Sequence, residues 1–479
     1  MTVHPNFVAG EASPVLDALN NLNPSDTRDV VGHYAHGDAA DVDAAVAAAA
    51  DALPRWRATN AAARAEILDK IGSELIARAA ELGDLLAREE GKTLKEAAGE
   101  VLRSGQLFKF FAGEAYRATR EGYPSVRDGI ELTVEREPLG VVGVLTPWNF
   151  PVSIPAWKIA PAIAYGCTVV FKPAELVPAS AWALAEIIGR CGLPKGAFNL
   201  VMGHGAVVGD AIVRHPGVAG VSFTGSTKVG KAIGHALFER GAKMQLEMGG
   251  KNPLVVLDDA DLDLAIDCAV QGAFFSTGQR CTASSRLIVT RGIHDAFVAG
   301  MVERLKRLKV GDARAPDTEM GPVASQAQLD IDARYVAIGL SEGAEIVHGG
   351  RVIDGPAPGY WHEPTLFAGA SNAMTINRDE IFGPVAAVIE AADYDEALAI
   401  ANDCEQGLSS GIVTRDETVI RHFRAHAEAG MVQVNLPTAG MDFHAPFTGR
   451  KNSAYGPAEK GPYAREFFTE LKVVHERLG

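Results

Sequence analysis

Cysteine is scarce in this chain: 479 residues contain five, widely spaced and never arranged as CxxC. Their odd number and their spacing argue against a disulfide framework and against a zinc site, so no metal is expected. Reduced thiols are expected instead. That state leaves open a nucleophilic role for one of them.

Long apolar runs and large basic clusters are also missing. The first thirty residues have neither a basic start nor an apolar stretch of signal-peptide length, and no later run is long enough to cross a bilayer. A formal net charge of −15 argues against nucleic acid or anionic membrane as a partner. The sequence predicts a cytoplasmic protein that acts on small molecules.

The length and patterning predict an α/β protein of two or three domains. Amphipathic helices are expected between 41 and 120, and a β excursion at 121–137. Short apolar runs alternating with helical stretches then predict a parallel sheet with helical crossovers, followed by a second α/β alternation. Their expected strands are 139–146, 167–172, 198–203 and 217–223, then 286–290, 344–349, 386–391 and 430–435. The tail, 465–478, ends in a β-favouring piece that could pair with another subunit.

In parallel sheets ligands lie beyond the carboxyl ends of the strands, so the segments after the first four strands are candidates for a ligand site. "GHGAVVG" is one residue longer than the dinucleotide fingerprint and is often a simple turn. Gly225 and Ser226 of "FTGST" could hold a diphosphate at a helix start or merely cap that helix. Lys172 and Glu175 of "KPAE" could contact a ribose, favouring NAD over NADP, or form a solvated pair.

Three further residues are candidates for a catalytic role. Cys281 in "STGQRCTASS" has small polar neighbours, unlike a core cysteine. Glu247 before two glycines could be a desolvated base or a paired structural residue. Asn149 between aromatics and prolines could donate to an oxyanion or cap a helix.

Seven motifs in one order carry a resemblance that covers nearly the whole chain. They are "TPWNFP" (146–151), "KPAE" (172–175), "FTGST" (223–227), "EMGGK" (247–251), "GQRC" (278–281), "EIFGPV" (380–385) and "PFTGRK" (446–451). Together they resemble the NAD(P)-dependent aldehyde dehydrogenase superfamily. The resemblance implies a Rossmann-like cofactor domain (1–120 and 138–247), an α/β catalytic domain (248–455) and a β oligomerisation flap (121–137 and 456–479) in a homodimer or homotetramer.

The resemblance also implies roles for individual residues. Cys281 matches the nucleophile, Glu247 the base for deacylation and Asn149 the oxyanion donor, while Lys158 and Glu459 match a proton relay. Cofactor contacts are expected at Thr146, Pro147, Trp148, Lys172, Glu175, Gly205, Gly209, Phe223, Gly225, Ser226, Gly249, Glu380 and Phe382. Substrate contacts are expected at Phe150, Trp157, Phe275, Arg280, Thr282 and Phe447. NAD is the expected cofactor, with NADP possible because Lys172 could neutralise part of a 2′-phosphate.

Two positions distinguish this chain from a neighbouring subfamily and bear on which aldehyde it oxidises. Succinate semialdehyde dehydrogenases present arginines where this chain has Trp157 and Phe275. The sequence looks most like α-ketoglutaric semialdehyde (2,5-dioxopentanoate) dehydrogenases, although similar scaffolds accept aromatic and aliphatic aldehydes. Arg280, Arg450 or a backbone site would then hold the substrate carboxylate.

Other classes stay open at this stage. A Cys–His hydrolase is compatible with thirteen histidines, but none lies near Cys281 in the sequence. Acyl transfer to coenzyme A is disfavoured by Glu247, since acylating relatives lack that base. A binding protein with a decayed site is disfavoured because nucleophile, base and cofactor residues are all present.

Overall fold

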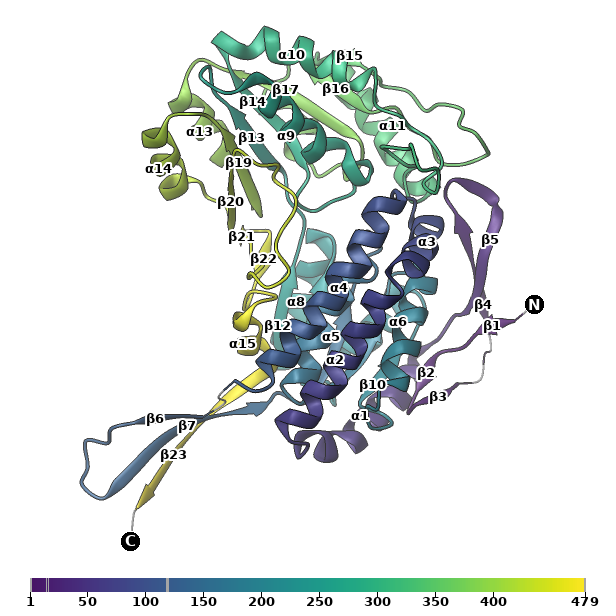
Figure 1. Ribbon diagram of the computed structural model, residues 1–479, viewed down its shortest axis with the longest axis vertical. Coiled ribbons are helices and arrows are strands. Elements are labelled where there is room, and N and C mark those ends of the chain that lie inside the picture. The colour runs from purple at the N-terminus through teal and green to yellow at the C-terminus, as the bar shows by residue number, and fades with distance from the viewer. Residues whose placement is uncertain (1, 14, 16, 118–119, 478–479) are drawn as a thin grey trace.

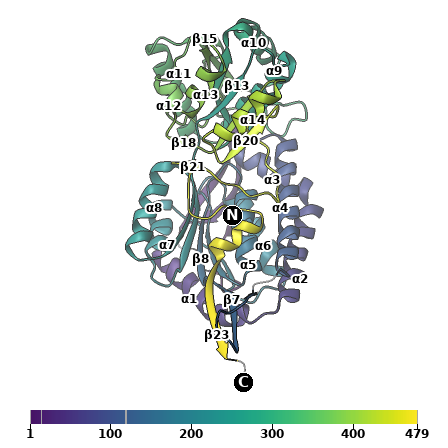
Figure 2. The same cartoon turned by 90° about the vertical axis from the view of Figure 1, so that its left-hand side faces the viewer.

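The computed structural model describes residues 2–13, 15, 17–117 and 120–477. Two α/β units are stacked along its longest axis, and a narrow β ribbon projects from the lower one (Figure 1 and Figure 2). No helix in the described ranges combines the length and apolarity needed to span a bilayer.

The sheet of the lower unit has five parallel strands. They are β8 (Val141–Leu145), β9 (Thr168–Lys172), β10 (Phe198–Leu200), β11 (Gly220–Thr224) and β12 (Lys243–Glu247). The spatial order β12-β11-β8-β9-β10 is the 3-2-1-4-5 order of dinucleotide-binding folds, read from the other edge. The strand order reverses beside β8, so the carboxyl ends of β8 and β11 frame the ligand-binding crevice.

Short antiparallel strands extend this sheet at both edges. β2 (Phe7–Val8) and β3 (Glu11–Ala12) follow β10, and β22 (Ala454–Tyr455) pairs with β12. A separate sheet near the N-terminus contains β1 (Val3–His4), β4 (Ala18–Asn23) and β5 (Asp26–Ala35). β22 brings a segment from late in the chain to the end of β12, where Glu247 lies.

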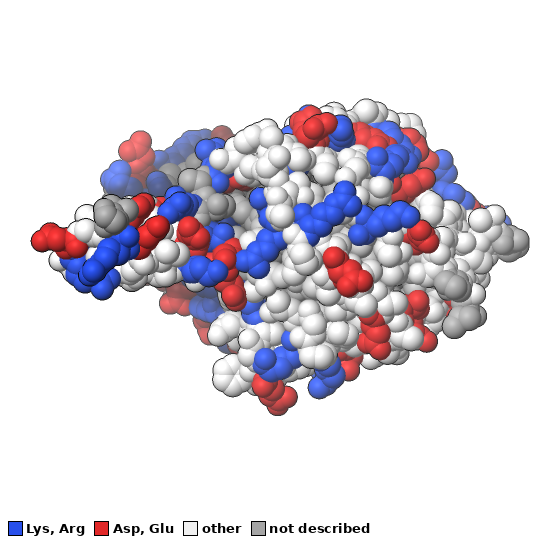
Figure 3. Space-filling model, turned by 90° about the horizontal axis from the view of Figure 1, so that it is seen from below, with Lys and Arg blue, Asp and Glu red and all other residues white. Residues whose placement is uncertain are grey.

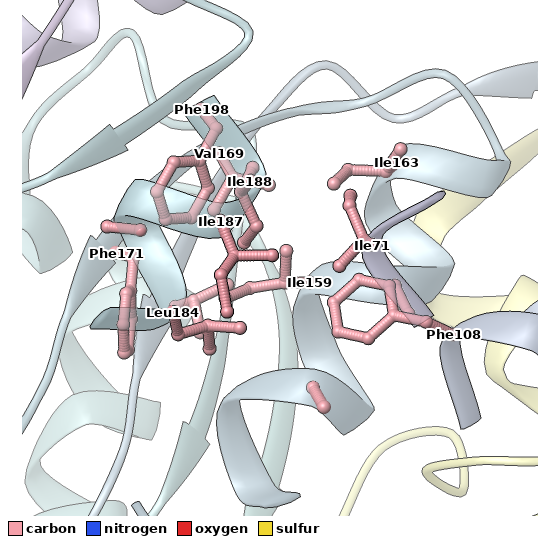
Figure 4. Packing of buried hydrophobic residues seen from close by; sticks show 14 of the residues in the cluster. Ile71, Phe108, Ile159, Ile163, Val169, Phe171, Leu184, Ile187, Ile188 and Phe198 are labelled. Carbon is pink, nitrogen blue, oxygen red and sulfur yellow. The ribbon is translucent and has the colours of Figure 1, made fainter. Parts of the chain in front are cut away.

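Helices cover both faces of the lower sheet. One face packs against α2 (Ala61–Ala77), α3 (Ala79–Glu90), α4 (Leu94–Glu114), α5 (Ser153–Ala164) and α6 (Pro178–Arg190). The other packs against α1 (Ala39–Arg57), the π-helical turn η1 (Gly205–Gly209), α7 (Asp210–Arg214) and α8 (Thr227–Glu239). Strand residues alternate between the two cores: Val142 and Val144 enter the first, Val141 and Leu145 the second. Figure 4 shows the first core, where Phe108, Ile159 and Leu184 meet between helices and sheet.

The upper unit repeats the arrangement. Its parallel strands run β16 (Thr365–Ala368), β17 (Val385–Ala391), β14 (Ser284–Thr290), β13 (Asn252–Val256), β19 (Ser409–Val413) and β20 (Met431–Val434), with β15 (Glu345–His348) antiparallel at the β16 edge. Its helices are α9 (Leu262–Phe274), the 3₁₀ turn η2 (Phe275–Gly278), α10 (Arg291–Leu305), α11 (Gln326–Ser341), α12 (Thr375–Arg378), α13 (Tyr394–Asn402) and α14 (Glu417–His426). The predicted second α/β alternation is present, with three strands, β13, β16 and β19, beyond those expected.

The projecting ribbon joins the predicted excursion to the tail. Strands β6 (Arg120–Tyr123), β7 (Ile130–Pro138) and β23 (Thr469–Arg477) form an antiparallel sheet in the order β23-β7-β6. The tail therefore pairs with β7 of its own chain, from Thr469 opposite Pro138 to Arg477 opposite Ile130. Residues 118–119, 478 and 479 of the predicted segments lie outside the described residues.

The remaining short elements are β18 (Gln406–Gly407) paired with β21 (Arg450–Lys451), and the 3₁₀ turn η3 (Pro462–Ala464) and α15 (Arg465–Phe468), which lead into β23. Seen from below, basic and acidic side chains are interspersed on the ribbon and the base of the molecule (Figure 3). On that face, charges of one sign do not merge into a broad field.

Candidate active site

Two loops from different sheets meet at the junction of the units. Asn149 follows β8, and its Nδ2 donates to the carbonyl of Gln279 at 3.0 Å. Gln279 precedes Cys281 by two residues, on the segment that leads into β14. The fold thus brings the predicted oxyanion donor to the predicted nucleophile.

Cys281 is half-buried and packs against a small apolar cluster that includes Phe447 and that Trp157 also contacts. Burial raises the pKa of its thiol to about 12, and the negative charges of Glu380 and Glu247 add to that effect. The backbone N–H groups of Cys281 and Thr282 lower the pKa, but by less. The thiol is therefore protonated in this state and needs a base to accept its proton.

The segment before the nucleophile has a strained backbone. Ser276 and Thr277 have φ of 50° and 58°, in the left-handed region that non-glycine residues rarely occupy. Glu96 of α4 holds this segment, because its Oε1 accepts from the Ser276 N–H at 2.8 Å, from Ser276 Oγ at 2.9 Å and from Arg280 Nη2 at 2.7 Å. Arg280 therefore has a carboxylate partner at Nη2, while its Nε is buried without an acceptor among the described residues.

The Asn149 loop is held from the same helix. Lys92 donates from Nζ to the Asn149 carbonyl at 2.5 Å and to Glu100 at 2.7 Å. The other oxygen of Glu100 accepts from the N–H groups of Val152 and Ser153 at 2.9 and 3.0 Å. Glu96 and Glu100, one turn apart on α4, therefore each fix one of the two reacting loops.

We expect Glu96→Gln to lower kcat roughly 10- to 100-fold, because a small displacement of a reacting group is costly to the rate. The glutamine removes the charge that Arg280 faces while keeping an acceptor oxygen. Steady-state kinetics together with thermal melting test this. Glu81→Gln, which changes an exposed glutamate paired with Arg78, is the matched control and should leave kcat unchanged. A lower melting temperature with normal kcat would limit Glu96 to a structural role.

A buried ionic group lies at the end of β12. Lys158 of α5 forms an ion pair with Glu459, and both side chains are almost fully buried. Burial raises the pKa of Glu247 well above its usual value; the charge of Glu459 adds to this and Lys158 offsets it. Oε2 of Glu247 is buried without a hydrogen-bond partner among the described residues. Such a carboxylate is suited to accept a proton.

Two neighbours of this group were not foreseen from the sequence. Lys158 Nζ also donates to Ser222 Oγ at 3.0 Å, and Ser222 Oγ donates to Gln245 Oε1 at 2.7 Å. Both lie on buried strands, where a polar residue needs a partner. Polar residues inside "GVSF" and "MQLE" are the sequence signal that would have indicated them.

Lys172 and Glu175 lie together past the end of β9, 3.6 Å apart. Glu175 Oε1 also accepts from the Gly205 N–H at 2.5 Å, at the start of η1. Burial alone would raise the pKa of Glu175, but Lys172 and the Gly205 N–H outweigh it, so the net shift is downward. A carboxylate that stays ionised here would disfavour a 2′-phosphate. Gly209 lies at the end of η1, close to Lys172. A Cβ added to Gly209 would lie 3.9 Å from Cδ of Lys172.

The crevice between β8 and β11 has unused polar atoms. Oγ1 of Thr146 and Oγ1 of Thr224 are buried without partners in the described part of the chain. Ser226 caps α8 by accepting from the Val229 N–H at 3.4 Å. Thr224 was missed by sequence reasoning, although it stands in "FTGST". These atoms at the strand-order reversal fit a polar ligand such as a dinucleotide.

Aromatic packing and close glycines shape the crevice. Trp148, after Pro147, meets Phe382 edge to face with ring centroids 5.5 Å apart, and Phe382 has a φ of 64°. A Cβ on Gly225 would lie 2.5 Å from the ring of Phe223, so only glycine fits there.

Glu380 occupies the side of the crevice nearest the thiol. Its Oε1 accepts from the Gly250 N–H at 3.0 Å, and a Cβ on Gly249 would come within 1.9 Å of its Oε2. Burial raises the pKa of Glu380 to about 7. Because glycine has no Cβ, residue 249 leaves space for the Glu380 carboxylate beside the backbone.

The predicted substrate residues fall in several places. Trp157 and Phe447 face each other with centroids 5.1 Å apart, beside Cys281. Phe150 packs under the Lys92 ammonium, Phe275 joins the core of the upper unit, and the Thr282 carbonyl accepts from Thr438 Oγ1 at 2.7 Å. The structure thus brings two of these rings to the nucleophile, while Phe150 and Phe275 have other contacts.

Lys460 is a further residue that sequence reasoning missed. Its ammonium lies 4.6 Å from the Trp157 ring centroid and 5.5 Å from that of Phe447. The side chain is 1% exposed. Only its position directly after Glu459 could have drawn attention to it.

The family model described as aldehyde dehydrogenase family matches residues 11–474. The chain belongs to the aldehyde dehydrogenase family. It is 44% identical to an α-ketoglutaric semialdehyde dehydrogenase of Bacillus subtilis, covering 98% of this chain and 97% of that protein. It is 42% identical to a 2,5-dioxopentanoate dehydrogenase of Saccharolobus solfataricus, covering 98% of each.

Solved structures confirm the aldehyde dehydrogenase fold. A betaine aldehyde dehydrogenase from Staphylococcus aureus, in complex with NAD+, superposes with a TM-score of 0.97 at 32% identity, covering 99% of this chain and 95% of that one. The resemblance predicted from the seven motifs is therefore confirmed. This aldehyde dehydrogenase has relatives with two kinds of named substrate, one an anionic semialdehyde and one a cationic aldehyde.

Proposed function

We propose that this aldehyde dehydrogenase oxidises α-ketoglutaric semialdehyde to 2-oxoglutarate with NAD+. Two of its relatives, at 44% and 42% identity, are named for this substrate, while a betaine aldehyde dehydrogenase of Cereibacter sphaeroides is 40% identical, so the choice of substrate depends on the residues of the site. As in related enzymes, the working form is a homodimer or homotetramer.

The observation that carries the choice of substrate is the ammonium of Lys460 over Trp157 and Phe447. Aromatic boxes recognise quaternary ammonium groups through the negative faces of their rings. Here a lysine of the same chain occupies that position, and its charge repels a second cation. The pocket therefore favours a negatively charged aldehyde over betaine aldehyde.

The residues around the crevice fit NAD+. Thr146 and Thr224 offer unused hydroxyls, the start of α8 offers N–H groups, and Glu175 disfavours the extra phosphate of NADP. Bound NAD+ supplies the acceptor for the hydride of the aldehyde. Lys172 beside Glu175 leaves some use of NADP open to measurement.

The protein residues divide the remaining chemistry. Cys281 gives its proton to a base, and its sulfur attacks the aldehyde carbon to form a thiohemiacetal. Asn149 Nδ2 and the Cys281 N–H stabilise the oxyanion. After oxidation to the thioester, Glu247 takes a proton from water, and the hydroxide formed releases the acid. Lys158 and Glu459 pass that proton away from Glu247.

A panel of aldehydes tests the proposal. We expect kcat/KM for α-ketoglutaric semialdehyde to exceed that for betaine aldehyde, benzaldehyde and hexanal by about 10- to 100-fold or more, the value of one charge-assisted contact. Succinate semialdehyde should fall between these. The rate of NADH formation is measured with each aldehyde, with NAD+ and NADP+, and with and without coenzyme A. Higher kcat/KM for betaine aldehyde or benzaldehyde would contradict the substrate, and acceleration by coenzyme A would contradict hydrolysis.

A further inference from the structure

Lys460 occupies a site that is costly for a lysine. Its backbone φ of 58° lies in the left-handed region, and Gly461 follows with a φ of 54°. Its side chain is 1% exposed, although lysines are almost never fully buried without a partner. Strained and desolvated residues of this kind persist where the surrounding structure fixes them, often at functional sites.

The protein satisfies this ammonium only in part. Nζ donates to the Asp442 carbonyl at 3.0 Å, and Lys460 forms no ion pair with a carboxylate of the described residues. Since an ammonium has three N–H donors, two remain without an oxygen acceptor from the described chain. The two aromatic rings partly compensate the charge without accepting a conventional hydrogen bond.

The loop that carries Lys460 is fixed against Phe447, one of the two rings beside the ammonium. Glu459 and Phe447 exchange backbone hydrogen bonds of 2.7 and 2.9 Å. Phe447 and Trp157 in turn pack in one cluster with Cys281. The ammonium is thus placed by rigid neighbours on the aromatic side of the nucleophile, where the remote end of a bound aldehyde would lie.

We infer that Lys460 binds the carboxylate at the far end of the substrate and so selects α-keto acid semialdehydes over neutral and cationic aldehydes. This inference rests on the proposed function and deepens it. The carboxylate supplies the acceptors that two N–H donors lack, and an N⁺–H···O⁻ bond in a desolvated pocket is strong.

The arginines considered from the sequence are placed differently. The charge of Arg280 is offset by its ion pair with Glu96, although its Nε has no acceptor among the described residues, and Arg450 is exposed on β21. Arg103 of α4 is exposed, although its charge acts on Lys460. Lys460 is therefore the buried cation that the structure places at the aromatic walls.

Lys460→Met, which keeps the length of the side chain and removes the charge, is the primary test. We expect the ratio of kcat/KM for α-ketoglutaric semialdehyde to that for pentanal to fall about 10- to 100-fold, mainly through KM. Lys460→Arg should keep part of the ratio. Lys309→Met, at an exposed lysine paired with Asp317, is the matched control and should leave the ratio unchanged. An unchanged ratio in Lys460→Met overturns the inference.

A measurement on the unmodified enzyme is independent of whether the variants fold. Burial lowers the pKa of Lys460 to about 8; Glu459, Asp442 and Cys281 oppose this shift, and Arg103 adds to it. The ammonium is lost as pH rises through that value, so KM for the semialdehyde should rise there relative to KM for pentanal. A parallel pH dependence for both aldehydes also overturns the inference. If the unmodified enzyme does not prefer the semialdehyde at neutral pH, the proposed function itself fails.

Discussion

Cys281→Ala should reduce kcat for aldehyde oxidation by on the order of 10⁴- to 10⁶-fold, the scale seen when a covalent nucleophile is removed. No neighbouring thiol replaces the sulfur, because the groups that act on it are carboxylates, backbone N–H groups and the Lys460 ammonium. NAD+ should still bind, since the crevice residues are untouched. NADH formation and NAD+ titration by fluorescence measure the two effects.

Cys404→Ala is the control for thiol loss. Cys404 is a half-buried cysteine whose Sγ donates to Gln406 Oε1 at 3.1 Å, and its replacement should leave kcat unchanged. Near-normal turnover in Cys281→Ala would refute the nucleophile. Loss of NAD+ binding in that variant would point to a wider collapse of the site instead.

Glu247→Gln should slow steady-state turnover by about 10² to 10⁴-fold, the usual contribution of a positioned general base. The block should come after hydride transfer, because glutamine cannot activate water to hydrolyse the thioester. If Glu247 serves deacylation alone, rapid mixing should show a burst of NADH of about one per active site, followed by a slow phase. If Glu247→Gln shows neither the burst of NADH nor the slow phase, Glu247 is also the base that accepts the Cys281 proton.

The pH dependence gives a second readout for the same residue. Because burial and Glu459 raise the pKa of Glu247, the basic form is present only above that raised value. The steady-state rate should therefore increase as the pH rises through the pKa of Glu247. Below that pKa the carboxylate is protonated and the rate should be low. In Glu247→Gln the rate of the slow phase should not show this increase with pH. Glu239→Gln on the exposed end of α8 is the matched control and should keep the profile.

Local patterns in the sequence were sufficient for much of the fold. Buried parallel strands read as uninterrupted apolar runs, which is why β8, β9 and β17 were expected near their observed positions. β12 and β19 were missed, because "KMQLE" and "SSGIV" contain polar residues whose partners come from distant segments. Ser409, for example, donates its Oγ to the Thr438 carbonyl, a contact that no local window contains.

The candidate site was predicted more from the order of the motifs than from single residues. A thiol among small polar residues drew attention to Cys281, whereas the neighbours of Asn149 left an oxyanion donor and a helix cap open until the seven-motif resemblance implied its role. Lys460, Glu96 and Glu100 were not found because their roles depend on contacts across the fold: an ammonium over two rings, and two carboxylates of one helix that each bind a different loop. Arg280 illustrates the converse, since its proximity to Cys281 in sequence suggested a substrate contact, whereas Glu96 neutralises it.

The first two turns of α4 tie together parts of the chain that are far apart in sequence. Glu96 reaches residue 276 and Glu100 reaches residue 152, so one short stretch sets the distance between them. During refolding, enzymatic activity should accordingly return later than helical content, because an active site forms only when two remote segments have docked on α4. Because both loops are bonded to α4, a displacement of one loop is transmitted through this helix to the other.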